Sequence, residues 1–221
     1  DRNGLLDGQD KFGGQAFRLI LSRAKEAFDI TREDPRLRDK YNGAGTSLGD
    51  QLLLARRLCE AGCGYVTIHT GYDGVWDMHA DGNSLNNTYA DYEHVLCPQF
   101  DLAFTALLED LQQRGMLEET VISVISEFGR TPNINHLYGR DHWSKAYCCW
   151  MAGGGVKAGI NYGETDDIGG EVVSNGVDVH DLHATILRLM GFDHTKLTYR
   201  YNGRDFRLTD NYGKVAEGII A

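Results

Sequence analysis

Several features that would place this chain in a well-defined class are missing. It has three prolines and five cysteines among 221 residues, and an odd, small number of cysteines does not make a disulfide framework. Neither Cys59/Cys63 nor Cys148/Cys149 has the paired CxxC arrangement of a zinc ribbon. No apolar run reaches about 18 residues, so we predict no membrane span. The polar start "DRNGLLDGQD" has no signal-peptide core and no methionine, which suggests a processed or truncated product.

Positive charge is also scarce. The chain has 32 acidic and 22 basic residues, which gives a formal net charge of −10. Such a surface repels phosphate backbones and anionic membranes, so we expect no nucleic-acid partner. The glycine-rich string "AGGGVKAG" lacks the spacing of a phosphate loop, and we interpret it as a tight turn.

The chain does contain an alternation of helical and strand-like patterns. Apolar periodicity predicts helices within 15–30, from Ser47 to Gly62 or Gly64, within 85–117 with a second helix starting at Pro98, and from the N-cap Asp178 to Gly191. Strand-like segments are "YVTIH", "TVISVIS" and "AYCCWMAGG". The alternation predicts an α/β protein with a mostly parallel sheet and helices on both faces. We expect a single domain over residues 1–221, in which 1–45 form a helical N-terminal extension.

Polar residues follow two of the predicted strands, and ligands of open parallel sheets bind beyond the carboxyl ends of the strands. The acids and histidines in these places are Asp73, Asp77, His79 and Asp81 after the first strand, and Glu127, Asp141 and His142 after the second. Mixed carboxylate and imidazole groups suit a divalent metal such as Zn²⁺ or Mn²⁺. The sequence therefore predicts a metal site at this edge.

These residues also have structural interpretations. Asp73 suits a turn and His79 a solvated loop. Glu127 ends an apolar strand, where a carboxylate is costly to bury unless a cation accompanies it. That cation is either a metal ion or a salt-bridge partner such as Arg130 or Arg140, and both alternatives remain open.

Six ordered segments, taken together, resemble the DUF1501 proteins, an uncharacterised bacterial family related to the alkaline phosphatase and sulfatase superfamily. They are "LLLARRLCEAG", "VWDMHADGN", "SEFGRTPNIN", "GRDHW", "MAGGGVKAG" and "DLHATILRLMGFD". The resemblance covers Thr46 to the C-terminus. It implies an alkaline phosphatase-like three-layer α/β sandwich that lacks the N-terminal part of the full fold, and an exported or periplasmic location.

The resemblance also implies roles for individual residues. In the superfamily one strand ends in a metal-binding Asp-His pair, and Glu127 and Phe128 stand in those two places. His142 fits a later loop histidine, and Asp77 with His79 resembles the pair that holds the other metal. Asp73 competes with Asp77 for that role, and Asp141 is a secondary candidate. Phe128 cannot ligate, so one metal position loses a ligand.

The function implied is metal-dependent hydrolysis of phosphate or sulfate esters. The substrate would be a small anionic ester, with Arg130 or Arg140 as contacts for its anion, because the guanidinium group donates paired hydrogen bonds. The superfamily's nucleophile comes from an upstream strand that these segments do not include. The alternative is a non-catalytic scaffold or binding protein that has lost the nucleophile and part of the metal site.

Overall fold

The structure is a computed structural model that describes residues 24–42, 47–69, 76–79 and 91–221. Within these ranges the chain divides into two compact units. We call residues 24–42, 47–69 and 91–113 the helical unit, and residues 76–79 and 114–221 the mixed unit. The prediction of one domain over the whole chain stays a prediction.

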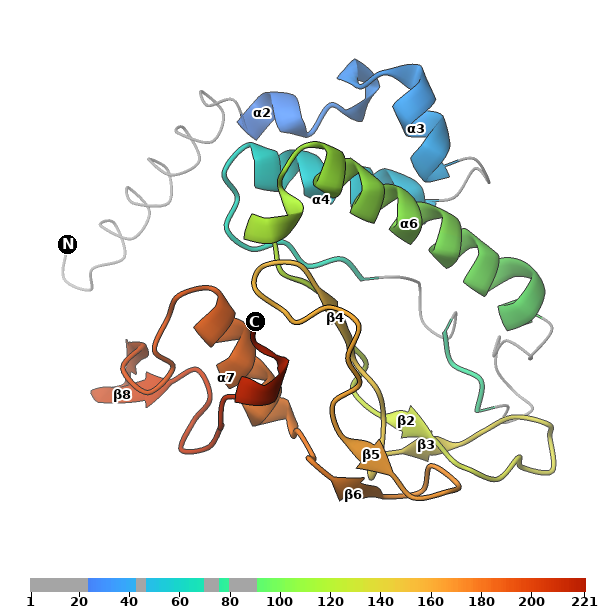
Figure 1. The fold of residues 1–221 in the computed structure, drawn as a ribbon, viewed down its shortest axis with the longest axis vertical. Coiled ribbons are helices and arrows are strands. Elements are labelled where there is room, and N and C mark those ends of the chain that lie inside the picture. Colours follow the sequence, from blue (N-terminus) through green and yellow to red (C-terminus); the bar gives the residue numbers. More distant parts are fainter. Residues whose placement is uncertain (1–23, 43–46, 70–75, 80–90) are drawn as a thin grey trace. The chain divides into compact units, whose positions relative to one another are not determined.

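The helical unit is built on three packed α-helices. Its elements in chain order are α2 (Ala24–Ala27), η1 (Ile30–Arg32), α3 (Pro35–Asn42), α4 (Ser47–Glu60), the π-helical turn η2 (Tyr92–Leu96) and α6 (Cys97–Gln113). Helices α3, α4 and α6 contact one another, and α4 and α6 lie side by side (Figure 1). Tyr41, Leu53 and Leu111 are almost fully buried and form the centre of this core.

Local sequence signals explain where these helices begin and end. The side chain of Asp34 accepts a hydrogen bond from the backbone N–H of Arg36 at 2.8 Å, and Pro35 occupies the first helical position of α3. Gly62 and Gly115 have φ of 93° and 69° just after α4 and α6, where a left-handed residue ends a helix. The predicted helix from Ser47 and the stop near Gly115 are confirmed.

The helical unit buries a charged network around Arg56. Its side chain has no exposed surface, and it pairs with Asp110 at 2.9 Å, Glu33 at 2.8 Å and Glu60 at 2.5 Å. The hydroxyl of Tyr41 donates to the same Asp110 carboxylate at 3.0 Å. The network joins α3, α4 and α6, because Tyr41, Arg56 and Asp110 belong to these three helices. Loss of one partner would leave a buried charge unpaired, which is very costly.

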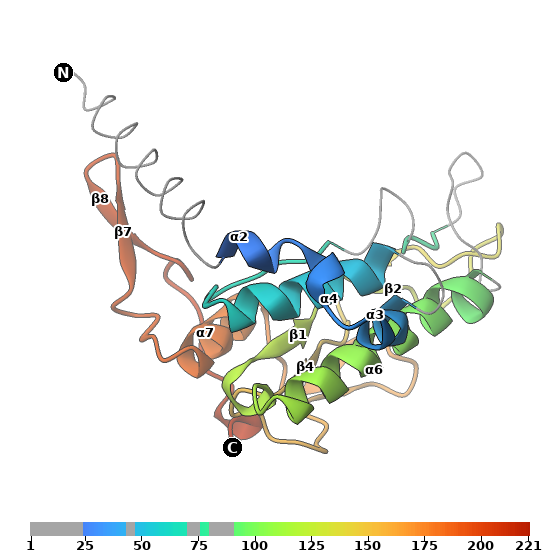
Figure 2. The ribbon, with the colours of Figure 1, turned by 90° about the horizontal axis from the view of Figure 1, so that it is seen from above.

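The mixed unit contains short strands and one substantial helix. Its elements are η3 (Leu117–Glu119), β1 (Ile122–Val124), β2 (Gly129–Arg130), β3 (His142–Trp143), β4 (Trp150–Ala152), β5 (Glu164–Thr165), β6 (Val172–Ser174), α7 (Val179–Leu189), β7 (Thr198–Tyr201), β8 (Arg204–Arg207) and η4 (Glu217–Ile219). The strands pair as β1–β4, β2–β3, β5–β6 and β7–β8, and every pair is antiparallel. The β7–β8 hairpin projects away from α7 (Figure 2).

The predicted alkaline phosphatase-like sandwich with a mostly parallel sheet is wrong. The described residues hold five α-helices and four two-stranded antiparallel sheets. "TVISVIS" contributes only the three-residue β1, and Ile125 after it is 50% exposed. Parallel neighbours need a crossover connection, usually a helix. The chain between β1 and β4 contains the β2–β3 pair and loops instead, and "YVTIH" forms no strand within its described residues 65–69.

Helix α7 matches its prediction closely. The Asp178 side chain accepts hydrogen bonds from the backbone N–H groups of His180 and Asp181, and the Asp181 side chain completes a capping box. Gly191, with φ of 85°, follows its end. None of the helices in the described ranges combines the length and the apolar character that crossing a membrane requires.

Candidate metal centre

The short segment 76–79 is held in the mixed unit by the loop that joins β2 to β3. Three of its backbone carbonyl groups accept hydrogen bonds from β2 and that loop: Trp76 from Arg130 Nη2 at 3.3 Å, Met78 from the backbone N–H of Arg140 at 2.9 Å, and His79 from Asn135 Nδ2 at 2.6 Å. Met78 is buried, with 8% of its surface exposed. The segment is therefore fixed by its main chain, which sets the directions of Asp77 and His79.

Asp77 is the hub of a cluster of four side chains. Its Oδ2 lies 2.7 Å from Nδ1 of His79, and its Oδ1 and Oδ2 lie 3.1 and 3.2 Å from Nε2 of His142. Arg130 Nη1 donates to Oδ1 at 2.6 Å. One carboxylate thus contacts two imidazoles and one guanidinium group.

The β2–β3 pair presents two of these side chains together. Arg130 and His142 are directly opposite each other in the antiparallel register, so their side chains lie on the same face. Gly129 allows β2 to lie close to the backbone at Ala146, since a Cβ at this position would lie 2.0 Å from the carbonyl oxygen of Ala146. Only glycine fits this position without a shift of the backbone.

Phe128 supports the cluster from the side. Its ring stacks on His142 with centroids 4.2 Å apart and an interplanar angle of 27°, and the guanidinium of Arg130 lies 5.6 Å from its centroid. The imidazoles of His79 and His142 meet edge to face at 4.9 Å. Phe128 therefore packs against His142 and Arg130, which are two of the three residues that contact Asp77, and contributes no ligand.

The donor atoms of Asp77, His79 and His142 suit a small divalent ion. One ligand atom from each residue lies within 4.8 Å of the other two. Tetrahedral zinc, with bonds of about 2.0–2.2 Å, places its ligands about 3.3–3.6 Å apart. Oδ2 of Asp77 lies 2.7 Å from Nδ1 of His79 and 3.2 Å from Nε2 of His142, which is shorter than this spacing, so the side chains would have to shift to admit an ion. Two imidazoles and one carboxylate favour Zn²⁺ and related metals.

The electrostatics keep the central carboxylate ionised. Burial by itself raises the pKa of Asp77, but hydrogen bonds from His79, Arg130 and His142 outweigh it and hold that pKa well below its usual range. About a quarter of the Asp77 and His79 side chains is exposed, and nearly half of the His142 side chain. An ion or a small solute can therefore reach the cluster from solvent.

The sequence-predicted residues divide into two groups. The structure brings Asp77, His79, His142 and Arg130 together, and it leaves Glu127 exposed and outside the cluster. In the described ranges Glu127 pairs with neither arginine, because Arg130 pairs with Asp77 and Arg140 donates to the carbonyl of Thr131 at 2.8 Å.

The secondary candidates have other positions. Asp141 is exposed and accepts a hydrogen bond from Asn135 at 2.9 Å, so it acts beside the cluster and not in it. Asp73 lies outside the described residues. The predicted role of Asp73 and the metal itself stay predictions.

Sequence reasoning did not find Asn135, although it is central to the geometry. Its Oδ1 accepts hydrogen bonds from the backbone N–H groups of Leu137 and Gly139, and its Nδ2 reaches both His79 and Asp141. The signal available was an asparagine in a turn-like segment, which commonly caps its own loop. That pattern does not reveal the contact to His79.

Comparison with known proteins places the chain in a family without adding a function. A family model described as "Protein of unknown function (DUF1501)" matches residues 2–220. The chain belongs to the DUF1501 family. Searches of curated proteins and of solved structures found no match. The DUF1501 assignment drawn from the six segments is thus confirmed, and no comparison links the chain to the alkaline phosphatase and sulfatase superfamily.

Proposed function

We propose that this DUF1501 protein binds one divalent transition-metal ion through Asp77, His79 and His142 and hydrolyses phosphate or sulfate esters there. The observation that carries the proposal is the convergence of one ionised carboxylate and two imidazoles within 4.8 Å. Three protein ligands leave a coordination position open, as catalytic zinc sites do. Glu127 is not part of the proposed ligand set.

The metal would lower the pKa of a water molecule and polarise the ester oxygen. The chain's own residues would do the rest. Arg130 lies on the rim of the cluster, where its planar guanidinium group can donate paired hydrogen bonds to a tetrahedral anion. Arg140 is less suited, because its Nη1 already donates to two backbone carbonyls. Phe128 would hold His142 in place during turnover.

A second function has a specific observation in its favour. Both oxygens of Asp77 already have protein partners, and Arg130 occupies Oδ1. The same four side chains can therefore be a hydrogen-bonded network that stabilises the β2–β3 loop in a non-catalytic binding protein. The two functions differ in one measurable property, which is whether the network gives way to a metal ion.

Metal titration of the full chain separates them. The protein is stripped with chelator, titrated with Zn²⁺ and with Mn²⁺, and its metal content is measured after gel filtration. We expect one ion per chain. His142→Ala and Asp77→Asn should each weaken binding by more than about tenfold. His136→Ala is the matched control, because His136 is an exposed histidine of the same loop and lies outside the cluster.

The catalytic part needs its own measurement. The metal-loaded protein is assayed with p-nitrophenyl phosphate and p-nitrophenyl sulfate, and Asp77→Asn should remove the activity. Protein that stays metal-free under saturating Zn²⁺ and Mn²⁺ refutes the whole proposal. If the protein binds metal but hydrolyses neither of these esters nor any of a wider ester panel, the proposed metal site stands and the proposed hydrolase activity is refuted.

A further inference from the structure

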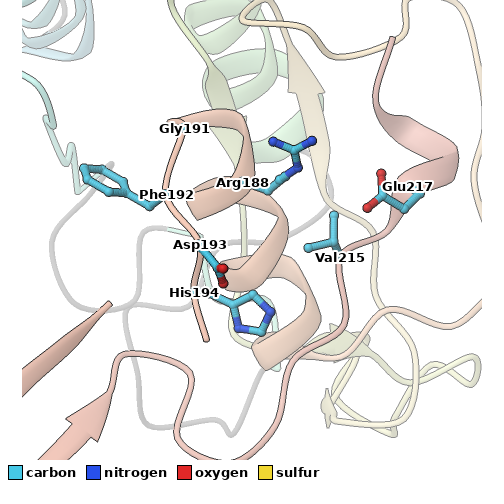
Figure 3. Close-up of a pocket in the computed structure, with 7 residues that line it drawn as sticks. All are labelled: Arg188, Gly191, Phe192, Asp193, His194, Val215 and Glu217. Atoms are coloured by element: carbon cyan, nitrogen blue, oxygen red, sulfur yellow. The ribbon is translucent and has the colours of Figure 1, made fainter. Parts of the chain in front are cut away.

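A second cavity lies in the mixed unit, at the end of α7, and no residue of the metal cluster contributes to it. It has a volume of about 320 Å³, and its walls come from the helix end, the turn after it and the chain near η4. Figure 3 shows the side chains that line it. Those used below are Arg188, His194, Val215 and Glu217.

Two opposite charges in this cavity lack protein partners. Within the described ranges, the guanidinium of Arg188 and the carboxylate of Glu217 make no hydrogen bond and no ion pair, either with each other or with another side chain. Asp193, at the same cavity, is different because it is paired with Lys196 at 2.9 Å. The cavity therefore offers one free cation and one free anion.

His194 adds a buried polar group. Its exposed fraction is 9%, and its Nδ1 lies 3.0 Å from the hydroxyl of Thr209, which is also buried. Within the described residues its Nε2 makes no hydrogen bond. His194 lines the cavity, so its second nitrogen can be satisfied from there.

From this arrangement we infer that the cavity binds a small zwitterion of the size of an α-amino acid. Its carboxylate pairs with Arg188, its ammonium group pairs with Glu217, and its apolar part lies against Val215. A ligand with one charge would satisfy one of the two free groups and leave the other unmatched. The volume is at the small end of ligand cavities, which suits a molecule of this size.

The test compares three molecules that share one carbon skeleton. L-leucine carries both charges, 4-methylpentanoate carries only the carboxylate, and 3-methylbutylamine carries only the ammonium group. Each is titrated to about 10 mM into the full chain, and binding is followed by NMR shifts or calorimetry. We expect leucine to bind at least about tenfold more tightly than either analogue.

Variants assign the contacts. Arg188→Gln and Glu217→Gln should each weaken leucine binding by about tenfold or more, and both residues are exposed enough to be changed without unfolding the chain. Arg207→Gln in β8 and Glu164→Gln in β5 are matched controls at exposed positions outside the cavity. Both variants should bind leucine as the unchanged protein does.

Three outcomes overturn the inference. Leucine that fails to bind, leucine that binds no better than its singly charged analogues, and cavity variants that bind like their controls each refute it. Asp77→Asn should bind leucine normally, because the cavity shares no residue with the metal cluster. The metal proposal and the zwitterion proposal can therefore each fail without affecting the other.

Discussion

Removal of the Arg130 charge should tighten metal binding while it weakens ester hydrolysis. Arg130 Nη1 lies 2.6 Å from the Asp77 oxygen that also faces His142. A divalent ion on that carboxylate would be repelled by the guanidinium group. Arg130→Met removes the charge and keeps an unbranched apolar side chain beside Phe128.

The magnitude follows from the geometry. A zinc-to-oxygen bond of about 2.1 Å places the ion about 4–5 Å from the guanidinium nitrogen. Coulomb's law for charges of +2 and +1 at that distance gives about 2 kcal/mol at the dielectric constant of water. Because about a quarter of each side chain is exposed, salt reduces this figure, and about 1–2 kcal/mol remains. The expected gain in affinity is about 5- to 30-fold.

The assay is competition for Zn²⁺ against a chromophoric chelator, at about 0.02 M and about 0.5 M salt. Arg130→Lys is the matched control, since it keeps the charge and should bind Zn²⁺ within about twofold of the unchanged protein. High salt should narrow the gap between the methionine variant and the wild type. If Arg130→Met binds Zn²⁺ no more tightly, Arg130 acts by orienting Asp77 and the electrostatic reasoning is refuted.

Three further predictions concern stability. Burial raises the pKa of Asp77, but its hydrogen bonds lower the pKa by more. The ionised carboxylate therefore stabilises the fold above the unfolded pKa of about 4, and that contribution disappears as the pH falls through the folded pKa. The difference in unfolding free energy between wild type and Asp77→Asn, measured with urea from about pH 7 to about pH 3, should become smaller at acid pH. Arg56→Met leaves the Asp110 carboxylate buried without its cation and should cost about 3–5 kcal/mol in the same measurement, whereas a loss below about 1 kcal/mol would contradict the network. Gly129→Ala drives a Cβ into the carbonyl oxygen of Ala146 and should cost about 1–3 kcal/mol and weaken Zn²⁺ binding, and unchanged stability would show that β2 moves freely.

Helix boundaries were predictable because their signals are local. Asp178 bonds to backbone groups two and three residues away, and Gly191 ends the same helix through its own φ of 85°. Neither effect depends on distant residues. The start of α4 at Ser47 and the end of α6 just before Gly115 were predictable for the same reason, because each boundary depends on a few neighbouring residues.

Strand pairing was not predictable in this way. An apolar run such as Val121 to Ile125 indicates burial, but it does not identify the neighbour or its direction. Here Val124 pairs with Trp150 in an antiparallel ladder, and Ile125 is already exposed. Alternation of helical and strand-like segments does not by itself establish βαβ connections, and no helix lies between β1 and β4 in the structure.

The closeness of Asp77 and His79 follows from the residues themselves, while their role as metal ligands stays a prediction. Asp77 and His79 are two apart, so a bend that bonds His79 to Asp77 brings them together whatever sheet surrounds them. His142 arrives through the β2–β3 pair and not through a parallel sheet edge.

Glu127 shows the converse. It was placed in the site because it follows an apolar strand, yet that strand ends three residues earlier, at Val124. The chain then bends, with the hydroxyl of Ser126 donating to the carbonyl of Phe128 at 2.9 Å. This bend leaves Glu127 in solvent and brings the Phe128 ring onto His142. The aromatic residue that the resemblance marked as a lost ligand thus has a role of its own, because it packs against a proposed ligand.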